Sequence, residues 1–204
     1  MTDLQFNSAF SENLVKEIQN YGVLNALEIE RIQTSLHYNT LAKSHFLFQS
    51  GSKCATIYFI LNGCFQLYQK DFNGNKRIKQ FAFDGCWITD FKAFHQRSIT
   101  NFELQALENS TYLALDYETY ESLTREIPVF SNYFRKVYQE FFILCQELFF
   151  ATIQNDGKGR YLYLTEKYPT LLQRVPLYML ASFLGVTPVL ISNIRKQIFK
   201  EPKS

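Results

Sequence analysis

A heptad stripe between residues 128 and 154 constrains the fold of this chain most strongly. Apolar side chains recur there in alternating steps of four and three residues, at Phe130, Phe134, Val137, Phe141, Leu144, Leu148 and Ala151. This spacing predicts one long helix whose apolar stripe packs against another helix, as in a coiled coil. We therefore expect these seven residues to form a dimer seam.

The same segment carries a second apolar stripe with the same spacing, made of Tyr138, Phe142, Cys145 and Phe149. Because two apolar faces need two partners, one is expected to pack on the chain's own domain and the other on a second copy. A long helix buried in the core of a monomer is the alternative. A membrane span is disfavoured because charged residues interrupt every apolar window of about 18 residues; they are Arg135, Lys136, Glu140 and Glu147.

From about Ser44 to residue 115 the apolar period changes to two, which predicts short β-strands. Apolar or aromatic clusters lie at residues 46–48, 57–61, 65–68, 78–83, 102–107 and 112–115. Asn73-Gly74 separates two clusters, and both residues tolerate the positive φ that a tight hairpin requires. Short strands at this spacing predict an antiparallel jelly roll. The apolar spacing of residues 1 to about 40 predicts helix. The expected fold class is α+β.

Composition and charge limit the possible functions. Hydrophobic residues make up 47% of the 204 residues, which is enough for real cores. The N-terminal residues lack a basic segment followed by an apolar run, so we expect a cytoplasmic protein without a secretory signal. Four scattered cysteines without a C-x-x-C pair argue against a metal site, and no cofactor is expected. From Asp156 onward the chain contains eight basic and three acidic residues, which suggests that this C-terminal segment binds a polyanion.

Residues 177–196 have the pattern of a helix-turn-helix. This motif needs a small residue where the two helices touch and a turn residue that permits a left-handed backbone, and Ala181 and Gly185 meet these demands. Thr187-Pro188 supplies an N-cap and a first-turn proline for the second helix. The inward positions are apolar: Leu180, Leu184, Val186, Ile191 and Ile194. An ordinary helical hairpin would explain the apolar spacing but not the other features together.

A second helix placed in the major groove would present its early outward residues to base edges. These residues are Thr187, Pro188, Val189, Ser192, Asn193 and Lys196. Asn193 is suited to pair with adenine and Val189 to touch a thymine methyl group. Arg195, Lys196 and Lys200 are expected to meet phosphates, which adds affinity without sequence information.

The order of these parts resembles the cyclic-AMP receptor protein/FNR (Crp/Fnr) family of bacterial transcription regulators. The most specific similarities are Ile57-Tyr58-Phe59-Ile60-Leu61-Asn62-Gly63 and the segment Ala181 to Pro188. The resemblance implies a homodimer whose β-domain senses a small effector and whose paired helices read a two-fold symmetric DNA operator, with RNA polymerase as a further partner. The expected domains are a cyclic-nucleotide-binding-like sensor (1–127), a dimerisation helix (128–154) and a helix-turn-helix domain (155–204).

The expected effector pocket departs from the family pattern for cyclic nucleotides. Its residues are Thr89, Asp90, Phe91, Thr100 and Asn101. Thr89 replaces a glycine, Asp90 shortens the sugar-binding carboxylate, and Thr100-Asn101 replaces the Arg-Ser pair that binds phosphate. Arg97-Ser98 would substitute for that pair only with a loop three residues shorter. The effector is therefore expected not to be cyclic AMP, and its identity stays open.

These observations predict a homodimeric, sequence-specific DNA-binding transcription regulator without enzymatic activity. The segment Asn155-Asp156-Gly157 would act as the hinge between the long helix and the DNA-binding helices. One alternative is a small-ligand-sensing module whose terminal helices contact protein rather than DNA. Another is a cupin-like enzyme, which three scattered histidines do not support because such a site needs clustered metal ligands.

Overall fold

The computed structural model describes residues 3–154 and 156–200, with side chains for 11–154 and 156–197. The chain forms two compact units. Met1–Leu67 and Phe81–Glu140 form the first unit, and Tyr68–Gln80 and Phe141–Ser204 form the second. The limits of these units differ from the domain boundaries expected after residues 127 and 154. The expected three-domain division stays a prediction.

The first unit begins with two helices, α1 (Asp3–Gln19) and α2 (Ala26–Ser35). A capping box starts α2, in which Asn25 accepts a hydrogen bond from the Glu28 amide and Glu28 accepts one from the Asn25 amide. The expectation that helix continues to about residue 40 is wrong. Strand β1 (His37–Leu41) follows α2 at once and pairs antiparallel with β8, because cross-strand partners outweigh local helical spacing.

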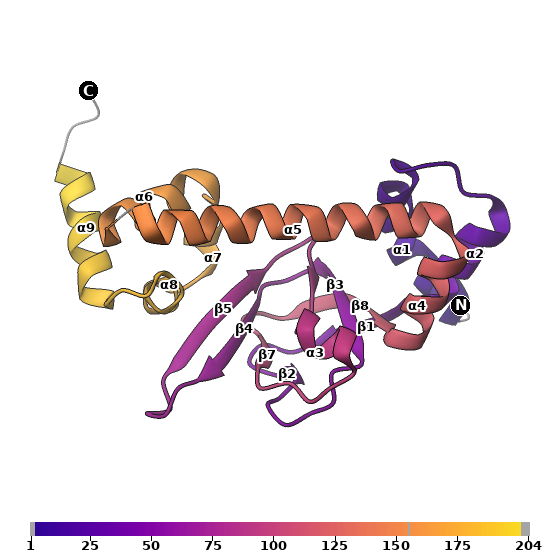
Figure 1. The fold of residues 1–204 in the computed structure, drawn as a ribbon, viewed down its shortest axis with the longest axis horizontal. Helices are drawn as coiled ribbons and strands as arrows, with labels where there is room; N and C mark the ends of the chain where they lie inside the picture. The colour runs from indigo at the N-terminus through magenta and orange to yellow at the C-terminus, as the bar shows by residue number, and fades with distance from the viewer. Residues whose placement is uncertain (1–2, 155, 201–204) are drawn as a thin grey trace. The chain divides into compact units, whose positions relative to one another are not determined.

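Within the described part of the chain, eight strands form two four-stranded sheets, which agrees with the predicted β-rich domain (Figure 1). One sheet has the order β1-β8-β3-β6 and the other β2-β7-β4-β5. The remaining strands are β2 (Phe46–Phe48), β3 (Thr56–Asn62), β4 (Phe65–Lys70), β5 (Lys76–Ala82), β6 (Trp87–Ile88), β7 (Glu103–Ala106) and β8 (Ser110–Asp116). Fully buried side chains from these strands, such as Ile57, Leu104 and Leu113, form the core of the first unit.

The predicted hairpin at Asn73-Gly74 joins β4 to β5, but its turn has another form. Of the two residues only Gly74 has a positive φ, of 79°. The Gly74 amide donates to the Asp71 carbonyl, and the Asp71 amide donates to the Asn75 carbonyl, each at 2.9 Å. A three-residue loop of this kind needs a left-handed residue only at its last position. The Asp71 carboxylate also accepts from the amides of Asn73 and Asn75, which holds the loop.

Two helices of the first unit were not predicted from the sequence. Helix α3 (Phe91–Gln96) follows β6, and α4 (Tyr117–Glu126) separates β8 from the long helix. Asp116 caps α4 by accepting a hydrogen bond from the Thr119 amide at 3.0 Å. The chain turns at Ile127, whose extended backbone is the conformation that a following proline favours.

Helix α5 (Pro128–Gln154) has the predicted bounds (Figure 1), yet its first stripe does not form one outward seam. Phe130 and Phe134 are 0% and 1% exposed and lie in the core of the first unit. The Phe134 ring lies 4.9 Å from the rings of both Trp87 and Tyr120. These two residues are thus removed from the expected dimer seam, because the chain's own core covers them. Val137 also packs on this core.

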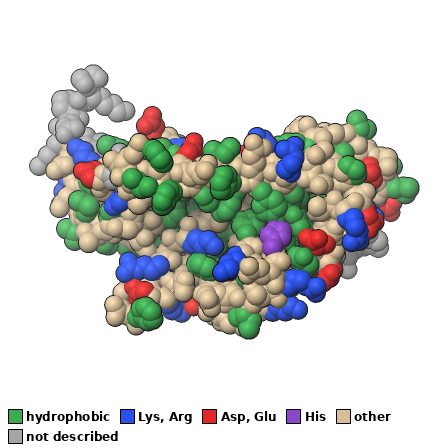
Figure 2. Space-filling model, in the orientation of Figure 1, with side chains coloured by type: hydrophobic (Ala, Val, Ile, Leu, Met, Phe, Trp, Pro, Cys, Tyr) green, Lys and Arg blue, Asp and Glu red, His purple; other side chains and the backbone are tan. Residues whose placement is uncertain are grey.

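The remaining seam residues lie in the second unit, where Ala151 is buried and Phe141, Leu144 and Leu148 are half-buried. A different face of α5 is free: Phe142, Ile143, Phe149, Phe150 and Ile153 are 44% to 66% exposed. At 100° per residue, this face lies on the other side of the helix from the predicted seam. Figure 2 shows hydrophobic side chains reaching the surface along this part of the chain. Of these exposed residues, Phe142 and Phe149 belong to the second apolar stripe, whereas Ile143, Phe150 and Ile153 lie outside both predicted stripes.

Four helices follow: α6 (Gly157–Lys167), α7 (Leu171–Arg174), α8 (Leu177–Leu184) and α9 (Pro188–Lys200). Of the expected hinge, Asn155 lies outside the described residues. Asp156 caps α6 by accepting a hydrogen bond from the Gly159 amide at 2.8 Å. Gly157 serves close packing, because a Cβ there would lie only 2.7 Å from Leu190 Cδ2 of α9.

Candidate nucleic-acid interface and effector pocket

The two helices α8 and α9 meet as a helix-turn-helix. Their axes change direction by 107°, within the range of this motif. Gly185 adopts the left-handed conformation with a φ of 66°, and the Val186 amide closes the turn on the Ala181 carbonyl at 2.9 Å. The turn therefore has the Gly-ended form that stops a helix sharply.

Packing between the helices follows the predicted inward positions. Leu180, Ala181, Ile191 and Ile194 are at most 2% exposed. Leu184 and Val186 are half-buried beside the turn. Helix α9 also packs on α6 through Leu190 and Gly157. The outward side of α9 is consequently held at a defined orientation within the second unit.

Thr187 begins α9 as predicted. Its hydroxyl oxygen accepts a hydrogen bond from the Leu190 amide at 3.2 Å, and its carbonyl accepts one from the Ile191 amide. Pro188 occupies the first position of the helix, where its missing amide proton is not needed. The first turn of α9 is thus fixed by residues that leave the outer side chains free.

The expected DNA-contacting residues fall on one exposed end and face of α9. Thr187, Pro188, Asn193 and Lys196 are exposed, and Val189 is 68% exposed. Ser192 and Arg195 are half-buried. Arg195 lies close enough to lower the pKa of the Tyr161 hydroxyl, although burial has the larger, opposite effect. The structure brings these residues together, while their roles toward DNA stay predictions; the Lys200 side chain lies outside the described side chains.

Three of the five expected effector-pocket residues form a tight polar cluster in the first unit. Thr89 and Thr100 are fully buried and Asp90 is 5% exposed. The Thr100 hydroxyl donates to Asp90 Oδ2 at 2.8 Å, and the Thr89 hydroxyl donates to the Thr56 carbonyl at 2.9 Å. The carboxylate thus accepts a hydrogen bond from the loop before β7 rather than standing open to solvent.

The other two expected residues lie apart from this cluster. Phe91 begins α3 and packs edge-on against Tyr138 of α5, with ring centroids 5.5 Å apart. Asn101 is exposed in the loop before β7. Cys54, one of the four scattered cysteines, places its sulfur 3.2 Å from the Thr89 hydroxyl oxygen. Burial raises the pKa of the Cys54 thiol, so it stays protonated at neutral pH.

Two contacts between α5 and the rest of the first unit were missed. His95 Nε2 lies 2.9 Å from the Tyr138 hydroxyl, and burial lowers the pKa of His95. Trp87 Nε1 donates to the Tyr133 hydroxyl at 2.9 Å, which donates in turn to Glu17 of α1 at 3.1 Å. The sequence carries no local signal for either, because the partners lie more than 40 residues apart.

A third missed contact joins the hairpin to the helix-turn-helix inside the second unit. The Ser182 hydroxyl of α8 donates to the Lys76 carbonyl of β5 at 2.6 Å and accepts from the Ile78 amide at 3.4 Å. One side chain thus bonds both a carbonyl and an amide of the same strand.

No group of three or more His, Cys, Asp or Glu side chains in the described part of the chain is placed to hold a metal ion. No single described helix has the length and hydropathy of a membrane span, and only the bent pair α8 and α9 meets those criteria jointly.

Comparison with known proteins shows the fold of the chain and a family model that matches its β-domain. Residues 38–126 match the family of cyclic nucleotide-binding domains. No curated protein matches the sequence. The c-di-GMP-responsive global regulator CLP of Xanthomonas campestris has a similar structure, with a TM-score of 0.67, 16% identity, and coverage of 85% of this chain and 91% of that chain.

Two further solved structures have a similar fold. A CooA variant from Carboxydothermus hydrogenoformans has a TM-score of 0.65 and 17% identity, over 90% of this chain and 83% of that chain. A Crp/Fnr-family transcriptional regulator from Eubacterium rectale has a TM-score of 0.64 and 15% identity, over 85% of this chain and 83% of that chain. At these identities the likeness establishes the fold.

Proposed function

We propose that this chain is a homodimeric, sequence-specific DNA-binding transcription regulator. Residues 38–126 match the cyclic nucleotide-binding domain family, and the chain has the fold of Crp/Fnr regulators. The observation that carries this proposal is the outer face of α9. Thr187, Val189, Asn193 and Lys196 are exposed together, on a helix whose inner side is locked by Ile191 and Ile194. A rigid helix with a free polar face is what major-groove reading requires.

The outer residues of α9 divide into two roles. Asn193 reads adenine through its amide, and Val189 contacts a thymine methyl group. Lys196, which is exposed, binds phosphate together with the half-buried Arg195. Thr187, Pro188 and Ser192 border the base-reading residues and set how closely α9 approaches the groove.

The free apolar face of α5 supports the proposed dimer. Phe142, Phe149 and Ile153 are each more than 60% exposed on one side of the helix. A second copy related by a two-fold axis would cover the same face on both chains. Two copies then present two α9 helices, which predicts half-sites about one helical turn apart.

The β-domain senses an effector other than cyclic AMP. A cyclic phosphate needs a cation, and the positions expected to supply it are Thr100, which bonds Asp90, and the uncharged Asn101. Effector binding is transmitted through α5, because Phe91 and His95 of α3 both contact its residue Tyr138.

Selection of bound sequences from a random DNA pool tests the function, using the full-length chain at physiological salt because non-specific binding is strongly salt dependent. An enriched two-fold symmetric motif is expected. Salt-sensitive binding without enrichment would contradict the proposal and favour the alternative, a ligand-sensing module whose terminal helices contact protein. A variant with Asn193→Ala and Lys196→Ala, which leaves the buried positions intact, serves as the matched control and should lose the enrichment.

A further inference from the structure

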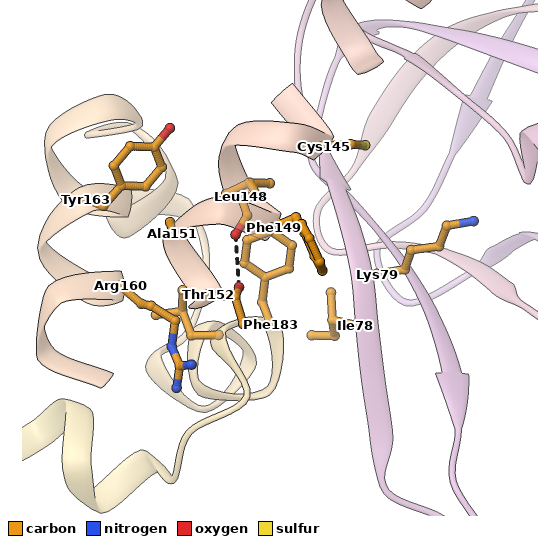
Figure 3. Close-up of a pocket in the computed structure, with 11 residues that line it drawn as sticks. Ile78, Lys79, Cys145, Leu148, Phe149, Ala151, Thr152, Arg160, Tyr163 and Phe183 are labelled. Atoms are coloured by element: carbon orange, nitrogen blue, oxygen red, sulfur yellow. Dashed lines mark hydrogen bonds between the residues drawn. The ribbon is translucent and has the colours of Figure 1, made fainter. Parts of the chain in front are cut away.

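A pocket of about 250 Å³ lies within the second unit, between β5, the C-terminal half of α5, α6 and α8. Its walls are mainly apolar and include Ile78, Leu148, Phe149 and Phe183. Figure 3 shows the rings of Phe149 and Phe183 gathered near Ile78. Flat apolar groups fit such walls because they bury area without leaving polar atoms unpaired.

Two cationic residues line this pocket, Lys79 of β5 and Arg160 of α6. Of these, Arg160 carries an unpaired polar group. Its Nε is buried and has no hydrogen-bond partner, which is unfavourable for a guanidinium N–H. None of the described residues that line the pocket is acidic. An acceptor brought by a ligand would pair with this N–H, and a negatively charged acceptor would make the stronger bond.

The other polar lining groups are differently placed. The Tyr163 hydroxyl donates to Glu147 at 3.4 Å and lies 3.3 Å from the Lys167 ammonium, so it is engaged outside the pocket. The Thr152 hydroxyl donates to the Leu148 carbonyl of its own helix (Figure 3). Lys79 directs its ammonium group away from the two rings in the same view. Arg160 is therefore the group that selects the ligand's charge.

We propose that this pocket binds a small organic monoanion with an apolar ring body, whose carboxylate accepts a hydrogen bond from Arg160. The volume lies below the range of about 300–1,000 Å³ that is usual for drug-sized ligands, which limits the body to a small ring system. A nucleotide fits poorly because its sugar hydroxyls would lose hydrogen bonds against apolar walls. Phe183 and Leu184 belong to α8, so the ligand would touch the DNA-binding motif directly.

Protection of a cysteine tests the binding. Cys145 lines the pocket and is exposed, whereas Cys86 is exposed elsewhere and serves as the internal control. The full-length protein is alkylated with iodoacetamide at alkaline pH, because burial raises the pKa of the Cys145 thiol, and each site is followed by mass spectrometry. Naphthoate at about four times its dissociation constant should slow alkylation of Cys145 about fivefold and leave Cys86 unchanged.

The charge requirement is tested with an uncharged probe and two variants. Naphthylmethanol should protect Cys145 much less than naphthoate, a comparison that needs no variant. Arg160→Gln should remove the advantage of naphthoate, whereas Lys158→Gln, on the same helix but outside the pocket lining, should keep it. Equal protection by both probes, no protection, or equal protection of Cys86 would overturn the proposal.

A consequence for DNA affinity rests on the proposed function. Because the ligand contacts α8, naphthoate should change the affinity of the wild-type protein for its selected operator but not that of Arg160→Gln. Cys145 protection with unchanged DNA affinity would overturn only this consequence. Absence of any selected operator would overturn the regulator function, and the alkylation result would still decide whether the pocket binds the anion.

Discussion

Ser182 of α8 donates its hydroxyl proton to the main-chain carbonyl of Lys76 in β5, over 2.6 Å. The same oxygen accepts from the Ile78 amide at 3.4 Å, so one side chain holds two main-chain groups of the hairpin. The hydroxyl therefore holds the first helix of the helix-turn-helix to a strand that lies about 100 residues earlier in the sequence.

Ser182→Ala should free this part of the hairpin. The loss of a hydrogen bond of about 0.5–1.5 kcal/mol predicts a rise of roughly two- to tenfold in the amide exchange rate of Ile78. Hydrogen exchange measured by NMR checks this. Thr165→Ala is the control, because its hydroxyl bonds only the Leu162 carbonyl of its own helix; the same rise there would refute a specific contact.

Gly157→Ala should destabilise the packing of α6 on α9. The added methyl would lie 2.7 Å from Leu190 Cδ2 and 3.1 Å from Val186 Cγ1, and overpacking of this kind costs about 1–3 kcal/mol. Thermal unfolding of the full chain measures the loss. Leu190→Ala removes the nearer group, so the double variant should recover stability relative to Gly157→Ala; no recovery would show that the clash is not the cause.

Glu126→Gln should make the stability of the folded chain depend less on pH in the acid range. Hydrogen bonds from Arg31, Ser122 and Arg125 lower the pKa of Glu126 to about 2 from its ordinary value of 4.5. Because the pKa is lower in the folded chain, the stabilisation is present above pH 4.5 and is lost as the pH falls toward 2. The melting temperatures of wild type and Glu126→Gln should thus differ at pH 7 and converge in acid.

Glu30→Gln is the control for this experiment, because it removes an exposed carboxylate of α2, the helix that carries Arg31. Its melting curve should follow that of the wild type at every pH. A difference between wild type and Glu126→Gln that stays constant from neutral to acid pH would contradict the role of the Arg31–Glu126 ion pair, whose atoms lie 2.6 Å apart.

Phe142→Glu should prevent formation of the proposed dimer. The Phe142 side chain is 62% exposed on the free face of α5, so a charge there is tolerated by the single chain but opposes burial against a second copy. Sedimentation at several concentrations measures the oligomeric state. Gln139→Glu places the same charge at a polar exposed position and should remain dimeric; a wild-type monomer at high concentration would contradict the dimer.

Asn193→Ala and Lys196→Ala should have different effects on DNA binding. The Asn193 variant should lose preference at one operator position, with a loss of about 1–3 kcal/mol for the preferred base. The Lys196 variant should weaken binding to all sequences alike and reduce the salt slope by about one. Titration of matched operators at several salt concentrations separates the two. Unchanged base preference in Asn193→Ala would remove its reading role.

Local patterns in the sequence were sufficient to predict several structural elements. The bounds of α5, the Gly185 turn and the Thr187 cap follow from heptad spacing and from the backbone preferences of single residues, which act within a few positions. The hairpin at Gly74 follows for the same reason. In contrast, β1 reads as helix by spacing and becomes a strand only because β8 pairs with it.

Periodicity predicts that a helix has two apolar faces, but only the tertiary structure decides which core covers each face. Phe134 and Phe142 are both apolar positions of α5, yet the first is buried by Trp87 and Tyr120 and the second is free. The Ser182 contact and the Arg160 pocket likewise join segments about 70 to 100 residues apart. Such contacts depend on how the chain packs at long range, which no local spacing specifies.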